Sequence, residues 1–163
     1  MPPSNAAISS SLIEIAKQRI EVKAGITESH LRRATSDLYY AMFHKLCETL
    51  ASALQTAEPI DIFREAYQTL YRYPKHGYIA KRCRDKKIER FEQPMQLFSQ
   101  QFVSFKDKRE RADYDPVSRM VMSEVRNDIE IVETVLARFD SCPEAHRFCF
   151  AVFVACEPTR VIV

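Results

Sequence analysis

The side chains best suited to chemistry lie together in one segment, which reads Arg-Glu-Arg-Ala-Asp-Tyr-Asp-Pro from Arg109 to Pro116. Phenylalanines upstream recur every three or four residues, and the same helical face continues to Arg109. A guanidinium on a buried face keeps its proton and needs an anion or hydrogen-bond acceptors. We therefore expect Arg109 either to form a structural ion pair, with Asp113 or Asp128, or to bind an external anion such as phosphate.

The residues after Arg109 should end this helix, because proline disfavours a helical conformation of the residue before it, here Asp115. Asp113 and Tyr114 are then placed at a helix end beside Arg109. These three residues are the first candidates for catalytic or binding roles.

Other common kinds of site are not indicated by the sequence. The four histidines are scattered and no Glu-x-x-His pair occurs, so we expect neither a metal nor another cofactor. Five cysteines without a Cys-x-x-Cys pair favour reduced thiols over disulfides. The only two glycines, Gly25 and Gly77, cannot build a phosphate-binding loop. Any chemistry should therefore come from Arg109 and its neighbours.

The composition predicts a single all-α domain over residues 1–163. Hydrophobic residues make up 46% of the chain, which is enough for a core, and two glycines are too few for the turns of a β sandwich or barrel. No charged and apolar signal peptide opens the chain. The longest uncharged apolar run, residues 148–156, is far shorter than the ~20 residues of a membrane span. We therefore expect a soluble, cytoplasmic protein without a membrane partner.

Apolar periodicity predicts an up-and-down bundle of four to five main helices, with a short basic helix and a C-terminal segment. Thr27 and Ser29 are both candidate caps, Pro94 suits a first helical turn, and Val121 should face inward. The pattern leaves open whether residues 143–163 form a helix or an extended tail. The expected main helices cover about residues 9–23, 27–56, 62–73, 94–114 and 118–139.

Positive charge is concentrated in two segments of a chain whose net charge is only +2. Residues 81–90 and 106–111 together carry ten basic and four acidic residues, a balance of +6, so the remainder carries −4. Such a basic segment either binds a polyanion or is simply a solvated face. The candidates for nucleic-acid binding are Lys81, Arg82, Lys86 and Lys87.

A second patterned face lies on the helix expected over residues 27–56, almost opposite its apolar stripe. This face is either exposed to solvent, part of a site, or a subunit interface of a homodimer. Its members, which we call the helix-two ridge, are Arg33, Asp37, Tyr40 and His44.

Three strings in this sequence are together similar to one protein family. They are the helix from Leu31 that contains Tyr-Tyr-Ala-Met-Phe-His, the Tyr71-Arg72…His76-Gly77 segment, and the Arg109 segment with its Ala-Asp-Tyr element. With these strings the chain resembles the HEPN superfamily of small helical domains, over a core of about residues 27–136. The resemblance implies a helical bundle, commonly a homodimer, used in toxin–antitoxin and phage-defence systems beside a small nucleotidyltransferase.

The resemblance also implies a function. Active members are metal-independent ribonucleases whose arginine holds the phosphate, while a histidine a few residues later helps to activate the ribose 2′-hydroxyl. Arg109 matches that arginine, but Asp113 and Tyr114 occupy the region where the histidine is expected. The tentative catalytic set is therefore Arg109, Asp113 and Tyr114, with His44 as a replacement base.

Three interpretations follow, of which the third is an unrelated helical bundle that binds a small molecule. The first is an RNA-binding domain, either a ribonuclease or a toxin component, with Arg109 as the phosphate clamp. The alternative is a non-catalytic dimeric module that docks another protein, such as a nucleotidyltransferase-type antitoxin.

Overall fold

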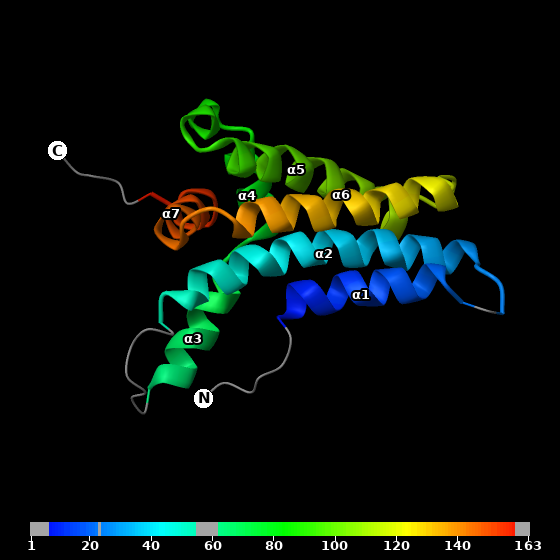
Figure 1. Ribbon diagram of the computed structural model, residues 1–163, viewed down its shortest axis with the longest axis horizontal. Helices are drawn as coiled ribbons and strands as arrows, with labels where there is room; N and C mark the ends of the chain where they lie inside the picture. The colour runs from blue at the N-terminus through cyan, green and yellow to red at the C-terminus, as the bar shows by residue number, and fades with distance from the viewer. Residues whose placement is uncertain (1–6, 23, 55–61, 159–163) are drawn as a thin grey trace.

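A computed structural model describes residues 7–22, 24–54 and 62–158, and within these ranges the chain is all-α, with helices and no strands (Figure 1). This confirms the predicted fold class. The helices are α1 (Ile8–Ile20), α2 (Glu28–Ser52), α3 (Phe63–Arg72), α4 (His76–Cys83), the 3-10 helix η1 (Lys86–Arg90), α5 (Gln93–Tyr114), α6 (Met122–Asp140) and α7 (Glu144–Ala155).

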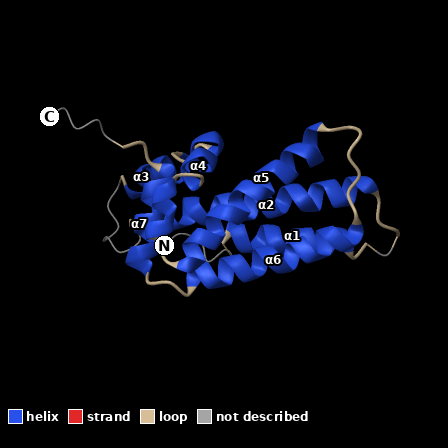
Figure 2. Cartoon of the chain, turned by 90° about the horizontal axis from the view of Figure 1, so that it is seen from above, coloured by secondary structure: helices blue, strands red, loops and turns tan. Residues whose placement is uncertain are grey.

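The central element is α2, which packs against α1, α3, α5, α6 and α7. Helices α1, α2, α5 and α6 lie side by side, with α1 running opposite to α2 and α5 opposite to α6 (Figures 1 and 2). Helices α4 and α7 pack on each other at one end of this group, while α3 packs on α2 and leans away from it (Figure 1). The C-terminal part of α2 therefore meets three shorter helices, and its N-terminal part meets the end of α5.

Local sequence signals explain where the long helices begin. The side chain of Thr27 accepts from the backbone N–H of His30, and the His30 ring in turn accepts from the backbone N–H of Thr27, which forms a capping box for α2. Pro94 lies in the first turn of α5, where its missing N–H costs no hydrogen bond. Both boundaries agree with the sequence-based expectation. The expected ends of the first two helices fall partly on residues outside the described ranges.

The core is aromatic along α5. The phenylalanine stripe of this helix is fully buried at Phe98, Phe102 and Phe105, and its rings continue into Phe139 and Phe150 of α6 and α7. Burying each such ring contributes on the order of 2 kcal/mol relative to exposure. This packing holds α5 rigidly against the bundle and so positions the residues at its C-terminal end.

Helix α6 begins four residues later than expected, at Met122 rather than Ser118. The reason lies in the preceding loop, where the carboxylate of Asp115 accepts hydrogen bonds from the backbone N–H groups of Val117 and Ser118 and holds a turn. Val121 is therefore outside the helix and 47% exposed, so the expectation that it faces inward is wrong.

The segment after Pro143, whose conformation the sequence left open, is helical over most of its described part. Helix α7 buries Phe150, Ala151 and Val154 against the bundle. Residues 159–163 lie outside the described ranges.

Candidate functional site

Arg109 lies near the C-terminal end of α5, and its side chain is 20% exposed. Its Nη2 donates a hydrogen bond of 2.9 Å to the hydroxyl of Tyr40, and the same atom lies 3.5 Å from the hydroxyl of Tyr114. Its Nε lies 2.8 Å from Oδ2 of Asp113, one helical turn later. The guanidinium is thus held between α2 and the end of its own helix.

Three tyrosine rings surround this guanidinium. The carbon Cζ of Arg109 lies 5.3 Å from the ring centroid of Tyr114, 5.5 Å from that of Tyr40 and 5.9 Å from that of Tyr39. These distances are within the range of cation–π attraction, which stabilises a cation that has lost part of its water. We call Arg109, Tyr39, Tyr40, Asp113 and Tyr114 the Arg109 cluster.

Asp113 neutralises Arg109 only in part. Although Nε lies 2.8 Å from the carboxylate oxygen, the two atoms do not have hydrogen-bond geometry, and this buried nitrogen forms no hydrogen bond among the described residues. The contact is therefore an ion pair that leaves one donor unsatisfied, which is rare for a buried group. Asp113 is itself anchored by Ser36, whose hydroxyl donates to Oδ1 at 2.5 Å.

The other expected partner of Arg109 is engaged elsewhere. Asp128 is buried on α6 and accepts from Lys108, the residue before Arg109 in the sequence. Burial raises the pKa of Asp128, and the Lys108 ammonium opposes that rise. Of the two carboxylates that the sequence offered for an ion pair, the structure selects Asp113.

His76 is the residue that sequence reasoning missed. It begins α4, and its Nδ1 lies 2.7 Å from the hydroxyl of Tyr39. Its ring stacks on Phe43 with centroids 3.8 Å apart and meets the edge of Tyr40. The residue as a whole remains exposed, yet partial burial of its ring lowers the pKa of His76, and the charge of Arg109 lowers it further. The one signal in the sequence was the His76-Gly77 string, to which no role could be given.

His44, expected as the replacement base, has a different partner. Its Nδ1 lies 2.7 Å from the hydroxyl of Tyr71 on α3, and burial lowers the pKa of His44. Its ring also meets Phe43 edge-on. The structure therefore connects His44 to α3, and places His76, through Tyr39 and Tyr40, in the surroundings of Arg109.

Three members of the helix-two ridge also have partners within the chain. Asp37 accepts from Arg19 of α1 at 2.5 Å, Tyr40 accepts from Arg109, and His44 meets Tyr71. Arg33 is exposed. The second patterned face of this helix thus serves contacts with α1, α3 and α5, and the homodimer stays a prediction.

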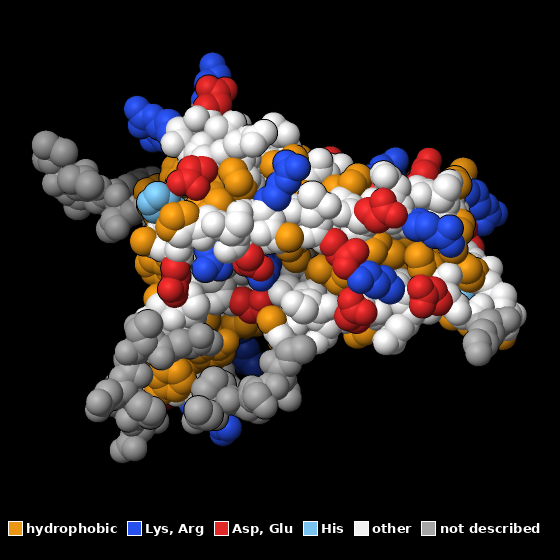
Figure 3. Space-filling view, in the orientation of Figure 1, with side chains coloured by type: hydrophobic (Ala, Val, Ile, Leu, Met, Phe, Trp, Pro, Cys, Tyr) orange, Lys and Arg blue, Asp and Glu red, His pale blue; other side chains and the backbone are white. Residues whose placement is uncertain are grey.

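The four residues expected to bind nucleic acid divide into two kinds. Lys81, Lys86 and Lys87 are exposed, whereas Arg82 is partly buried and lies 4.0 Å above the ring of Phe153. Arg82 also donates to the carbonyl of Phe153 at 3.1 Å and to Asp85 at 2.8 Å. Lys and Arg side chains project from the region of η1 at the top of Figure 3, with acidic side chains between them.

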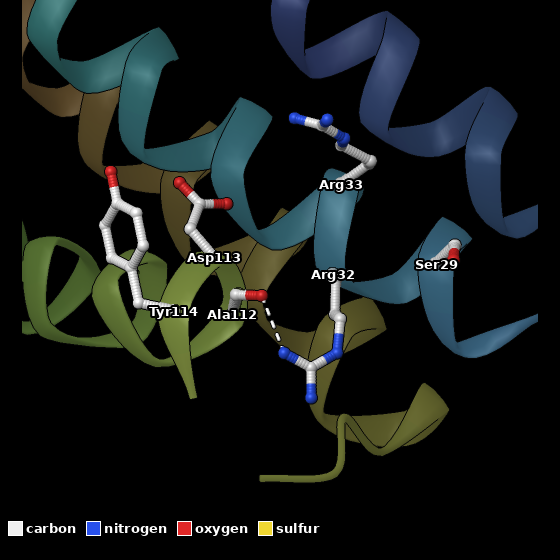
Figure 4. Close-up of a pocket in the computed structure, with 6 residues that line it drawn as sticks. All are labelled: Ser29, Arg32, Arg33, Ala112, Asp113 and Tyr114. Atoms are coloured by element: carbon white, nitrogen blue, oxygen red, sulfur yellow. Dashed lines mark hydrogen bonds between the residues drawn. The ribbon is translucent and has the colours of Figure 1, made fainter. Parts of the chain in front are cut away.

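A shallow pocket of about 420 Å³ opens beside the Arg109 cluster, between the start of α2 and the end of α5. Its lining residues, shown in Figure 4, define what we call the Tyr114 pocket: Ser29, Arg32, Arg33, Ala112, Asp113 and Tyr114.

Arg32 has a structural role in this pocket. Its guanidinium donates to the carbonyl oxygens of Ala112, at 2.7 Å, of Asp115, at 3.0 Å, and of Ser118. A cation in this position donates hydrogen bonds to the free carbonyls at a helix C-terminus. Its charge also interacts favourably with the negative end of the helix dipole. Arg32 therefore fixes the end of α5 and the loop that follows it.

Comparisons with known proteins identify no relative: no protein-family model matches the chain, and neither a curated protein nor a solved structure matches it significantly. Across the described ranges, no group of three or more His, Cys, Asp or Glu is placed to hold a metal ion. None of the helices described is both long and apolar enough to cross a bilayer.

Proposed function

We propose that the protein is an HEPN-like RNA-binding domain in which Arg109 holds a phosphate of the RNA backbone. The observation that supports this most directly is the incomplete satisfaction of Arg109, whose buried Nε forms no hydrogen bond in the described part of the chain. A phosphate oxygen supplies the strong acceptor that a guanidinium recognises best. The side chain as a whole is 20% exposed, although Nε itself is buried.

The surrounding charge is consistent with a polyanion. Lys81, Lys86 and Lys87 are exposed on α4 and η1, and Arg111 is exposed one residue beyond Glu110 on α5. Backbone phosphates attract such side chains without reading the sequence of the nucleic acid.

Binding is tested by fluorescence anisotropy with a labelled single-stranded RNA. Arg109→Ala should weaken binding at least about tenfold, since a charge-assisted hydrogen bond to phosphate contributes about 1.5–3 kcal/mol. Arg138→Ala is the matched control, because it removes an equal charge from an exposed position at the far end of α6. An equal loss in both variants would show that only net charge matters and would contradict the proposal.

Cleavage of the bound RNA is a second candidate function, and His76 is the observation that favours it. A general base must be neutral near pH 7, and both burial and the charge of Arg109 lower the pKa of His76. In this reaction the imidazole accepts the 2′-hydroxyl proton, the 2′ oxygen bonds to phosphorus, the bond to the 5′ oxygen breaks, and the 5′ oxygen takes a proton from water.

The reaction would leave a 2′,3′-cyclic phosphate and a 5′-hydroxyl. Analysis of RNA termini after incubation without added metal tests this, with His76→Gln expected to abolish the product and His44→Gln to preserve most of it. Intact RNA with the wild-type protein would exclude cleavage and leave the binding proposal standing.

The partner-module alternative is favoured by a different region. Helix α3 packs on α2 and buries none of its residues fully, and a shallow apolar pocket on it includes Ile62, Leu70 and Tyr73. A docked protein would cover this face and would leave Arg109 to its pair with Asp113. Loss of complex formation after Leu70→Lys, with RNA binding absent in the wild type, would favour this alternative over the first.

We also propose that the protein is a homodimer, as the resemblance implies. Light scattering at micromolar concentration tests it. Because Tyr40 has an internal partner in Arg109, Arg33→Glu is the better disrupting variant, since it reverses an exposed charge of the helix-two ridge. A monomer in the wild type would contradict the proposal.

A further inference from the structure

The Tyr114 pocket contains two groups that contacts within the fold occupy only in part. The first is the ring of Tyr114, which is 70% exposed at the last residue of α5 and touches the structure through its contact with Arg109. An aromatic ring of that size exposed to this extent at a pocket wall gains nothing from the core. It is instead a flat surface on which another ring can stack.

The second is the guanidinium of Arg33. Its neighbour Arg32 donates to the carbonyl oxygens at the end of α5, whereas Arg33 is exposed and acts on the described residues through its charge. Burial raises the pKa of Asp37, and the charge of Arg33 is one of those that oppose this rise. In Figure 4, Tyr114, Asp113 and Arg33 point to one side of the pocket, and Arg32 points to the other side. The open side of the pocket thus has an aromatic ring at one end and an exposed cation at the other.

We infer that the Tyr114 pocket is a subsite for one nucleoside of single-stranded RNA, with its base stacked on Tyr114 and its phosphate held by Arg33. This inference rests on the proposed function, because it places the nucleoside next to the phosphate that Arg109 holds. A volume of about 420 Å³ is within the ~300–1,000 Å³ range of small-ligand sites. Alternating stacking and phosphate contacts are how single strands are bound without base pairing.

The test compares two single-stranded probes, a short oligouridylate and an oligomer of equal length in which abasic ribose replaces every nucleoside. Both carry the same phosphates, so only the bases distinguish them. The wild type should bind oligouridylate at least about fivefold more tightly, since one base stacked on an aromatic side chain contributes about that factor.

Four variants, one of them a control, test which residues produce this preference for the probe with bases. Tyr114→Leu should remove the difference between the probes, while Tyr114→Phe should retain it because the ring remains. Tyr73→Leu is the matched control, since Tyr73 is 44% exposed at the end of α3 and does not line the Tyr114 pocket. Arg33→Ala should weaken the binding of both probes equally, because the Arg33 side chain is proposed to hold a phosphate that both probes contain.

If Tyr114→Leu bound both probes as tightly as the wild type does, the subsite would be overturned. If Arg109→Ala still lost RNA affinity in that case, the proposed function would stand without the subsite. If the wild type bound neither probe, both the subsite and the proposed RNA-binding function would be overturned. Uridine monophosphate bound as tightly as oligouridylate would assign the pocket to a free nucleotide and would also overturn the subsite for a strand.

Discussion

Two arginines of nearly equal exposure, Arg82 on α4 and Arg109 on α5, form hydrogen bonds to different degrees. The side chain of Arg82 is 18% exposed and that of Arg109 is 20% exposed. Arg82 has a carbonyl at its Nε, a carboxylate at its Nη1 and an aromatic ring beneath its plane. Arg109 has rings on several sides but no hydrogen bond at Nε within the described ranges.

The number of acceptors around each guanidinium distinguishes a structural arginine from a candidate binding residue better than the exposed fraction of its side chain does. A guanidinium with matched acceptors gains nothing from an external anion, because those acceptors already replace its lost water. An arginine with an open donor has lost water without full compensation, a cost that proteins commonly accept at functional sites. By this criterion Arg82 joins α4 to α7, and Arg109 is available to a ligand.

The largest expected effect is the loss of stability in Arg82→Ala. Removing its guanidinium strands a partly buried carbonyl and exposes the ring of Phe153, which should lower the free energy of unfolding by about 2–3 kcal/mol. Arg109→Ala should change it by less than about 1 kcal/mol, because Asp113 keeps its bond to Ser36 and some contact with water. Urea denaturation of both variants measures these losses in the free energy of unfolding. A larger loss in Arg109→Ala than in Arg82→Ala would contradict the comparison.

Asp113→Asn should have the next largest effect, in the opposite direction. Without its charge, this residue no longer competes with an external phosphate for Arg109, so RNA affinity should rise several-fold, to about tenfold. Anisotropy measures the change, with Asp107→Asn as the control that removes an equal charge from an exposed position on α5. A fall in affinity would show that the Arg109–Asp113 pair is part of the binding geometry.

The exposed lysines should contribute less per residue than Arg109 does. Replacing Lys81, Lys86 and Lys87 by Ser should weaken RNA binding several-fold and reduce the slope of log affinity against log salt by up to ~0.7 for each phosphate that is no longer neutralised. Melting temperature should stay unchanged, in contrast to Arg82→Ala. An unaltered salt slope would identify these lysines as a solvated face.

The smallest effect concerns pH and His76. Its pKa is lowered in the folded protein from 6.5, so the unfolded chain binds the proton first as the pH falls. Stability should therefore decrease as the pH falls through about 6.5 and should level off below the lowered pKa of the folded state.

His76→Gln should make the stability profile flatter between pH 7 and 5. His44 also has a lowered pKa, so some slope should remain in this variant. An identical slope in His76→Gln and the wild type would mean that His76 is not held in its stacked position on Phe43.

The local part of the site was predictable from the sequence. Phenylalanine spacing placed Arg109 on the inner face of its helix, and Pro116 predicted where that helix ends, because both are properties of one helix and its immediate neighbours. The pair with Asp113 is also local, since residues four apart on a helix face each other. The cap at Thr27 and the all-α class follow from the same short-range rules.

The remaining partners depend on tertiary structure. Tyr40 accepts a hydrogen bond from Arg109, and the Tyr39 hydroxyl bonds to His76. Asp128 forms its ion pair with Lys108 and not with Arg109. Each of these contacts joins helices that are far apart in the sequence. Such contacts are decided by how far each helix is rotated and shifted against α2, which the packing of many side chains settles together. The sequence alone determined which residue types reach the end of α5, and only the fold decided that a histidine from α4 lies near them and that, among the described residues, one arginine donor there forms no hydrogen bond.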